Sequence, residues 1–242
     1  LTKLRQVGFA TLTASGLLTS SVALAELELR QAALPTGRVA ISYTSSSGAD
    51  IYVIDFDKQT VSPVIQSAKL DEYATWSPDG TKLVFCSEQT GDREIFIADA
   101  NGNGMTQLTK SPGADEDPDW SPDGSQIVFS SARLGGQNLF VMNADGSKPR
   151  ALTSDRYKNT TPRWSPRGTN ILFSTSSAWP GWDIGLYDLA TRTSALLTRS
   201  YRTYCRASWS PDGSAFAFSY GFGNEIDIWL QKKGGEPKQL TS

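Results

Sequence analysis

The pentapeptide Trp76-Ser77-Pro78-Asp79-Gly80 decides the fold, because it returns three times further along the chain. The copies are Trp120 to Gly124, Trp164-Ser165-Pro166-Arg167-Gly168 and Trp209 to Gly213, and their tryptophans lie 44, 44 and 45 residues apart. A second marker, Leu-Thr, keeps the same interval at 108–109, 152–153, 197–198 and 240–241. Two markers in fixed register predict a repeat architecture.

Each repeat is predicted to hold four short strands, of which the first runs into the tryptophan. Pro-Asp-Gly is typical of the turn that follows, because proline presets φ and glycine supplies a positive φ. The predicted second strands are 82–87, 126–131, 170–175 and 215–220, and the third strands are 94–99, 138–143, 183–188 and 225–230. The fourth strand ends at Leu-Thr. The strands are nearly continuous apolar runs, which is typical of sheets covered on both faces.

The sequence therefore predicts an all-β propeller of four-stranded antiparallel blades. A weaker copy precedes Trp76, with strands expected at 38–44, 50–56 and 61–65, so five blades are visible. The expected units are residues 26–65, 72–109, 116–153, 160–198 and 205–241. The inner strand of the first blade is expected either from Leu27 to Gln31 or from a C-terminal continuation, and with such a continuation the ring would have six blades.

Residues 1–25 have the pattern of an export signal. Lys3 and Arg5 form a basic start, Val7 to Ala25 carries no charge, and Ala23-Leu24-Ala25 fits a signal-peptidase site. A retained membrane anchor is the alternative. Either way we expect residues 26–242 to be periplasmic or secreted, and peripheral to the membrane at most.

The composition excludes several functional classes. The chain has no histidine, which rules out a Ser-His-Asp triad and a His-ligated metal site. The net charge of −2 predicts no attraction to nucleic acid. Cys86 and Cys205 lie at non-equivalent positions of their repeats, and Cys86 shares its register with Ser42, so a core residue is favoured over a disulfide.

The repeated residues of the pentapeptide favour structural roles. Asp79, Asp123 and Asp212 are predicted to cap backbone amides of the turn rather than to act in catalysis. Arg167 replaces this aspartate in the third copy, so the turn tolerates its loss. The repeated tryptophan is predicted to pack between blades.

The segments between Leu-Thr and the next tryptophan carry charges that differ between repeats. We expect these segments to form loops on one rim, where they would make a polarised binding mouth around the channel. The acidic candidates are Asp71, Glu72, Asp115, Glu116, Asp117 and Asp119, and the basic candidates are Arg163, Arg202 and Arg206. Trp179, in a hairpin of the fourth blade, is a further candidate contact. Asp115-Glu116-Asp117 is also a possible Ca²⁺ ligand set, although its spacing does not match an EF-hand. No other cofactor is expected.

Over about residues 38–242 the repeat resembles that of TolB-type propellers. The resemblance rests on the Trp-Ser-Pro-Asp-Gly start, on Phe85-Cys86-Ser87 and Phe129-Ser130-Ser131 at strand ends, and on the closing Leu-Thr. It implies a non-catalytic protein-binding propeller with an envelope partner, in that family a peptidoglycan-associated lipoprotein. TolB itself also has an N-terminal α/β domain, for which residues 26–38 leave no room. The alternatives are a carboxylate-based enzyme, such as a glycosidase working in the channel, and a propeller that binds a small ligand or glycan.

Overall fold

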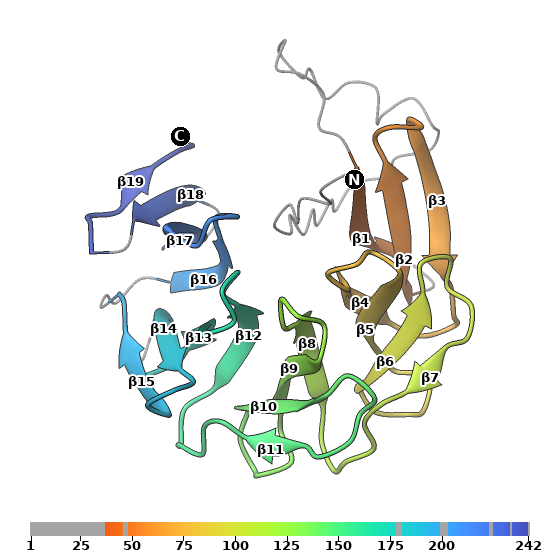
Figure 1. The fold of residues 1–242 in the computed structure, drawn as a ribbon, viewed down its shortest axis with the longest axis horizontal. Coiled ribbons are helices and arrows are strands. Elements are labelled where there is room, and N and C mark those ends of the chain that lie inside the picture. Colours follow the sequence, from red (N-terminus) through yellow and green to blue (C-terminus); the bar gives the residue numbers. More distant parts are fainter. Residues whose placement is uncertain are drawn as a thin grey trace.

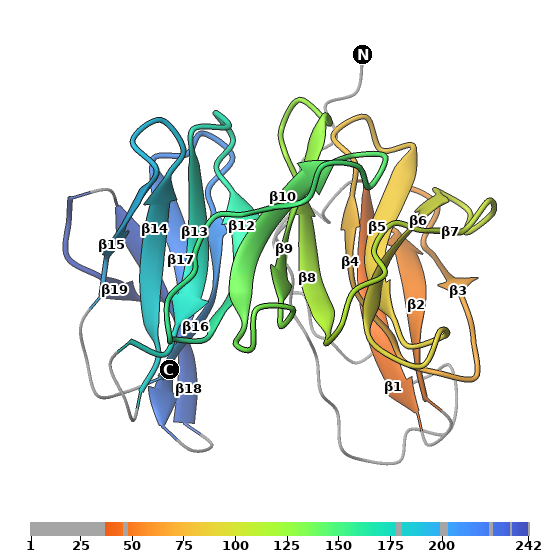
Figure 2. The ribbon, with the colours of Figure 1, turned by 90° about the horizontal axis from the view of Figure 1, so that it is seen from below.

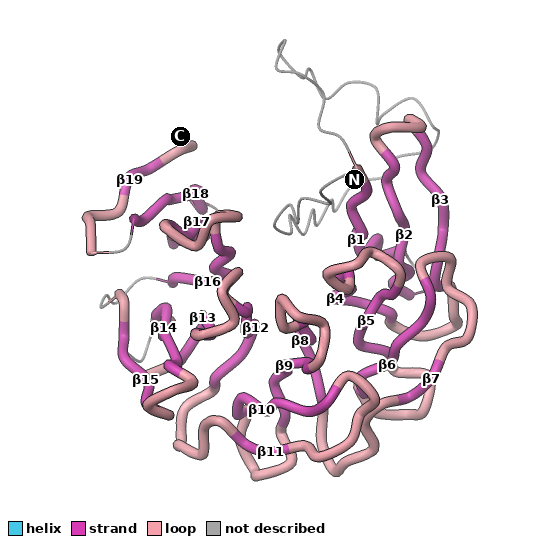
Figure 3. Tube along the Cα trace, viewed as in Figure 1, coloured by secondary structure: helices cyan, strands magenta, loops and turns pink. Residues whose placement is uncertain are grey.

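The computed structural model describes residues 37–45, 48–177, 181–198, 203–222, 225–232 and 234–241. Every regular element in these ranges is a β-strand, and the nineteen strands form five antiparallel sheets (Figure 3). These ranges include no helix that could cross a membrane.

Each sheet is one blade built from consecutive strands. Blade one holds β1 (Arg38–Ser45), β2 (Gly48–Asp55) and β3 (Thr60–Ile65). Blade two holds β4 (Asp71–Trp76), β5 (Lys82–Ser87), β6 (Glu94–Asp99) and β7 (Thr106–Gln107). Blade three holds β8 (Asp115–Trp120), β9 (Gln126–Ser131), β10 (Asn138–Asn143) and β11 (Arg150–Ala151). Blade four holds β12 (Asn159–Trp164), β13 (Asn170–Thr175), β14 (Asp183–Asp188) and β15 (Thr193–Leu196). Blade five holds β16 (Thr203–Trp209), β17 (Ala215–Phe222), β18 (Glu225–Lys232) and β19 (Lys238–Gln239).

The five blades stand around a common centre (Figure 1). The first strands β4, β8, β12 and β16 line the centre, while β7, β11, β15 and β19 lie outermost. Seen from the side, the inner strands run along the axis of the ring (Figure 2). The predicted all-β propeller with five blades is confirmed, and β5, β9 and β13 match the predicted second strands residue for residue. The expected signal at 1–25 and the expected inner strand from Leu27 to Gln31 lie outside the described residues.

The apolar core is divided among the junctions between blades. Ile127 and Phe129 of β9 pack with Val84 of blade two, whereas Val128 between them packs with Trp164 of blade four. The three β9 side chains are all fully buried. Alternate residues of one strand therefore serve two different junctions, which is the physical reason for the continuous apolar runs. The predicted packing of the repeated tryptophan between blades is confirmed at this junction.

The pentapeptide forms the turn between the first two strands of a blade. Ser77 Oγ donates a hydrogen bond to Asp79 Oδ1 at 2.6 Å, and Thr81 N donates to the same oxygen at 3.0 Å. Asp123 and Asp212 make equivalent bonds. These aspartates are turn caps, as predicted.

The third copy of the turn keeps its shape without an aspartate. Ser165 Oγ accepts hydrogen bonds from Asn170 N at 3.0 Å and from Thr169 N at 3.2 Å. Gly168 has a φ of 72°, close to the 69° of Gly80. The serine and the glycine therefore suffice for this turn, and Arg167 is tolerated.

The threonine of Leu-Thr ties the end of a blade to its third strand. Thr109 Oγ1 accepts a hydrogen bond from Ile95 N at 2.8 Å and donates to the Glu94 carboxylate. The same pair of bonds is made by Thr153, Thr198 and Thr241. The threonine of the second sequence marker therefore has a structural role in the repeat, and it is buried in blades two to four.

Cys86 is a buried free thiol. Its Sγ lies 3.5 Å from the main-chain oxygen of Asp115 in the next blade, to which it donates. The expectation that Cys86 is a core residue is confirmed.

Candidate functional site

Each of the inner strands β4, β8, β12 and β16 contains a β-bulge, at which its pairing with the second strand shifts. At each bulge one non-glycine residue has a positive φ, which is uncommon and strained. These residues, called the axial residues below, are Tyr73 (58°), Asp117 (54°), Thr161 (50°) and Arg206 (51°).

Hydrogen bonds from the preceding blade hold two of these bulges in place. Tyr73 N donates to Ser42 Oγ of blade one at 3.2 Å, and Arg206 N donates to Ser174 Oγ of blade four at 3.2 Å. A bulge leaves a main-chain N–H without a ladder partner, and these serines satisfy it. The axial side chains therefore start from fixed backbone positions.

Arg206 reaches across the centre of the ring. Its guanidinium carbon lies 5.2 Å from the centroid of the Tyr73 ring, although the two residues belong to blades five and two. A cation above an aromatic face at this distance is attracted by the ring. Burial raises the pKa of the Tyr73 phenol, and the nearby Asp117 and Glu72 carboxylates raise it further. Blades two, three and five thus contribute to one group of interacting side chains.

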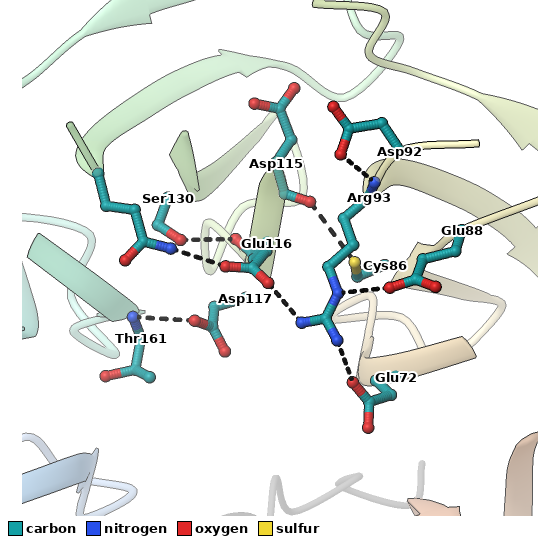
Figure 4. Close-up of polar contacts among 11 residues, drawn as sticks. Glu72, Cys86, Glu88, Asp92, Arg93, Asp115, Glu116, Asp117, Ser130 and Thr161 are labelled. Atoms are coloured by element: carbon teal, nitrogen blue, oxygen red, sulfur yellow. Dashed lines mark hydrogen bonds and ion pairs between the residues drawn. The ribbon is translucent and has the colours of Figure 1, made fainter. Parts of the chain in front are cut away.

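Asp117 has one satisfied and one unsatisfied carboxylate oxygen. Oδ2 accepts a hydrogen bond from Thr161 N of blade four at 3.3 Å, whereas Oδ1 has no hydrogen-bond partner. In Figure 4 the second oxygen points to the same side as Glu72. Only 6% of the residue is exposed, and burial raises the pKa of its carboxyl group, opposed by Arg163 and Arg206.

Arg93 gathers three glutamates at the inner edge of blades two and three (Figure 4). Its guanidinium nitrogens contact Glu88 at 2.9 Å, Glu72 at 3.4 Å and Glu116. Gln137 Nε2 also donates to Glu116 at 2.8 Å. Burial raises the pKa of Glu72, and Arg93 opposes this rise. One cation facing three carboxylates leaves this cluster, the Arg93 network, with an excess of negative charge.

Three of the predicted acidic residues are buried within or between blades. Asp115 is paired with Arg133 at 2.7 Å, and Asp71 is fully buried beside Ser87 on the neighbouring strand. Asp119 Oδ2 accepts a hydrogen bond from Trp164 N of the next blade at 2.8 Å. Burial raises the pKa of Asp119 to about 6. These carboxylates support the blades and do not face the mouth.

The basic candidates also differ in their position, because only one of them is an axial residue. Arg163 is half-buried, donates to the Pro162 carbonyl at 2.7 Å and interacts with the carboxylates of Asp117 and Asp119. Arg206 is the axial residue described above. Arg202 and Trp179 lie outside the described residues.

The acidic triplet at 115–117 does not converge on one point. Asp115 contacts Arg133, Glu116 contacts Arg93, and Asp117 accepts from Thr161. Within the described ranges no group of three His, Cys, Asp or Glu side chains is arranged to hold a metal ion. The three residues predicted as Ca²⁺ ligands therefore contact three different groups of the protein.

The structure corrects the predicted location of the charged residues. Apart from Arg202, which is not described, all of them lie on the inner strands β4, β8, β12 and β16 and not in rim loops. The described residues that were predicted to form a polarised mouth are therefore held by strands. Sequence reasoning missed Arg93 and Glu88, because both belong to the hairpin between β5 and β6, outside the segments that were compared.

Comparisons with known proteins agree with this fold. Residues 35–241 match the family model of the TolB β-propeller domain. The crystal structure of TolB from Acinetobacter baumannii has a TM-score of 0.77 at 22% identity, and the match covers 86% of this chain and 54% of that one. A protein from Agrobacterium tumefaciens assigned as TolB has a TM-score of 0.70 at 20% identity, over 81% of this chain and 74% of that one. An oligogalacturonate lyase in complex with manganese has a TM-score of 0.55 at 12% identity, over 85% and 74%. A search of curated protein sequences found no match.

These likenesses define the fold and its family. The chain spans about half the length of the Acinetobacter TolB. A lyase with the same architecture shows that the fold alone does not fix an activity. The family model, in contrast, covers all five blades. The chain therefore belongs to the TolB β-propeller domain family.

Proposed function

We propose that this protein is an exported, non-catalytic propeller that binds another protein of the cell envelope through its axial mouth. The resemblance to TolB and the export pattern at residues 1–25 support the compartment. By the same resemblance, a peptidoglycan-associated lipoprotein is the first partner to test.

The observation that carries the proposal is the charge distribution around the axis. The Arg93 network leaves surplus negative charge on blades two and three, while Arg206 places positive charge on blade five. Opposite charges on two sides of a mouth orient a partner with the complementary pattern and speed its association. Positions fixed by bulges lose little entropy when the partner binds.

A carboxylate-based enzyme is the second candidate. The observation in its favour is the raised pKa of Glu72 and Asp117, because a general acid needs such a shift. Glu72 is engaged by Arg93, however, and Asp117 by a main-chain N–H, which supports a binding role for both. Glycoside hydrolysis that Glu72→Gln abolishes would favour the enzyme.

The binding test uses the purified protein to capture partners from an envelope extract at low salt. Glu88→Lys changes the charge of the Arg93 network by two units while the axial residues stay unaltered. We expect it to slow association of the captured partner by about tenfold at low salt, and much less at about 0.5 M salt, where charges are screened.

Glu236→Lys is the matched control, because Glu236 is exposed in the loop between β18 and β19 and gives the same change in net charge. Equal association rates for the two variants would remove the axial mouth from the binding site. Thermal melts of both variants separate a binding effect from unfolding.

A further inference from the structure

Tyr73 and Asp117, the axial residues of blades two and three, lie close to Glu72. The Tyr73 ring supplies an aromatic face, and the carboxylates of Glu72 and Asp117 lie close enough to act on the phenol electrostatically. Asp117 is more than nine-tenths buried, and its Oδ1 has no hydrogen-bond partner. In Figure 4 this oxygen points to the same side as Glu72. A buried acceptor without a partner is unusual in a folded protein and favours binding of a hydrogen-bond donor.

The chain's own Arg206 shows which chemical group fits this site. Its guanidinium lies over the Tyr73 ring at 5.2 Å and interacts electrostatically with both Glu72 and Asp117. A guanidinium is planar, stacks on aromatic rings and donates several hydrogen bonds to carboxylates. A compact ammonium group lacks this planar match.

We propose that Glu72, Tyr73 and Asp117 form an axial pocket for the guanidinium of an arginine side chain of the partner protein, and that Arg206 holds this pocket until the partner arrives. The proposal rests on the proposed function, which it deepens by naming the residue that the mouth recognises. When the partner's arginine takes its place, Arg206 turns to an acidic group of the partner. An internal competitor of this kind weakens binding, because the partner can bind only while the pocket is free. The apparent association constant is reduced in proportion to the fraction of time for which the pocket is free.

The test measures binding of the peptide acetyl-Gly-Gly-Arg-Gly-Gly-amide by NMR titration of the purified protein. The comparison peptides carry citrulline, which is neutral and nearly isosteric, or lysine. Arg206→Asn removes the competitor, and asparagine tolerates the positive φ of this position. We expect this variant to bind the arginine peptide about fivefold more tightly than the parent, as for a pocket that Arg206 holds about four fifths of the time.

Arg192→Asn is the matched control. Arg192 also has a positive φ, 59°, but it is exposed in the outer turn between β14 and β15. This variant is expected to bind like the parent. Asp117→Asn and Tyr73→Asn should each weaken binding in the Arg206→Asn background, and Tyr73→Asn provides the test if Asp117→Asn does not fold.

Three results would overturn the pocket. They are equal binding of the arginine and citrulline peptides, equal binding of the arginine and lysine peptides, and an Arg206→Asn variant that binds no better than the parent. The proposed function fails separately, when Glu88→Lys and Glu236→Lys associate equally well with the envelope partner. If the arginine peptide still binds as expected after such a result, the pocket is supported and only the envelope partner is rejected.

Discussion

Blades four and five carry the same sequence pattern at the end of the blade but differ in burial there. Ile184 of blade four is fully buried, and Leu197 is partly buried in the same core cluster. Their equivalents in blade five, Ile228 and Leu240, are 41% and 54% exposed, and Ile226 beside them is 60% exposed. Blade five covers the first pair. The second pair lies on β18 and directly after β19, in the last blade of Figure 1.

This comparison shows that burial in a propeller is a property of the neighbouring blade. Ile184 and Ile228 are equivalent because they make the same hydrogen bond. The main-chain N–H of each donates to the threonine of Leu-Thr in its own blade at 2.9 Å. Only the side chains of a following blade distinguish the two positions. Equal sequence therefore does not mean equal contribution to stability.

Truncation of the two isoleucines gives the largest expected effect. Ile184→Ala removes fully buried contacts between blades four and five and should cost about 2–5 kcal/mol of unfolding free energy. Ile228→Ala starts from a half-exposed side chain and should cost about 1 kcal/mol or less. Urea unfolding of both variants measures the difference. Equal costs would mean that Ile228 is covered in solution.

Removing the hydrogen bond to the threonine of Leu-Thr gives an intermediate effect. Thr198→Val leaves the buried N–H of Ile184 without its acceptor and should cost about 1–3 kcal/mol. Thr241→Val breaks the same bond in blade five, where the threonine is exposed and water can replace it, so a cost below about 1 kcal/mol is expected. Chemical denaturation of the pair checks the ratio. A larger loss for Thr241→Val would contradict the comparison.

The turns of the two blades give the smallest effect, and it depends on pH. Hydrogen bonds from Ser210 Oγ first, then from Ser214, lower the pKa of Asp212 from 3.8 to about 2. A lowered pKa in the folded state means that this stabilisation is complete above about pH 4 and is lost as the pH falls through 2. Asp212→Asn should therefore lower the melting temperature slightly at pH 7 and leave it unchanged near pH 1.

Blade four lacks this cap, and Arg167→Asp should restore it. The expected gain in melting temperature has the same pH window and the same small size, since the position is exposed. A gain that persists near pH 1 would show that the charge of Arg167, and not the missing cap, was responsible. Thermal melts at pH 7 and near pH 1 measure both turn variants.

Local sequence signals predicted most of the fold. The pentapeptide, the Leu-Thr marker and the apolar runs gave strands β5, β9 and β13 with their observed ends. These signals act within a few residues, because a turn needs its proline and glycine and a strand needs its run of apolar side chains. The cap at Asp79 and the packing of Trp164 followed from the same local logic.

The candidate site depended on contacts that no local signal contains. The charges of Asp117 and Arg206 were visible in the sequence, but the bulges in β8 and β16 that give these residues a positive φ were not. A bulge has no sequence mark here, since four different residue types occupy the four axial positions. The role of Arg93 depends on carboxylates from two blades.

The sequence by itself determined the repeat, the strands and their turns, because each of these is a short-range consequence of residue type. Only the tertiary structure decided which charges are buried, which are paired and which face the axis. It brought Arg206 of blade five over Tyr73 of blade two, residues far apart in the chain. It also left Ile228 exposed where Ile184 is buried. Both outcomes arise from how blades close around a centre, and that closure is a property of the whole ring.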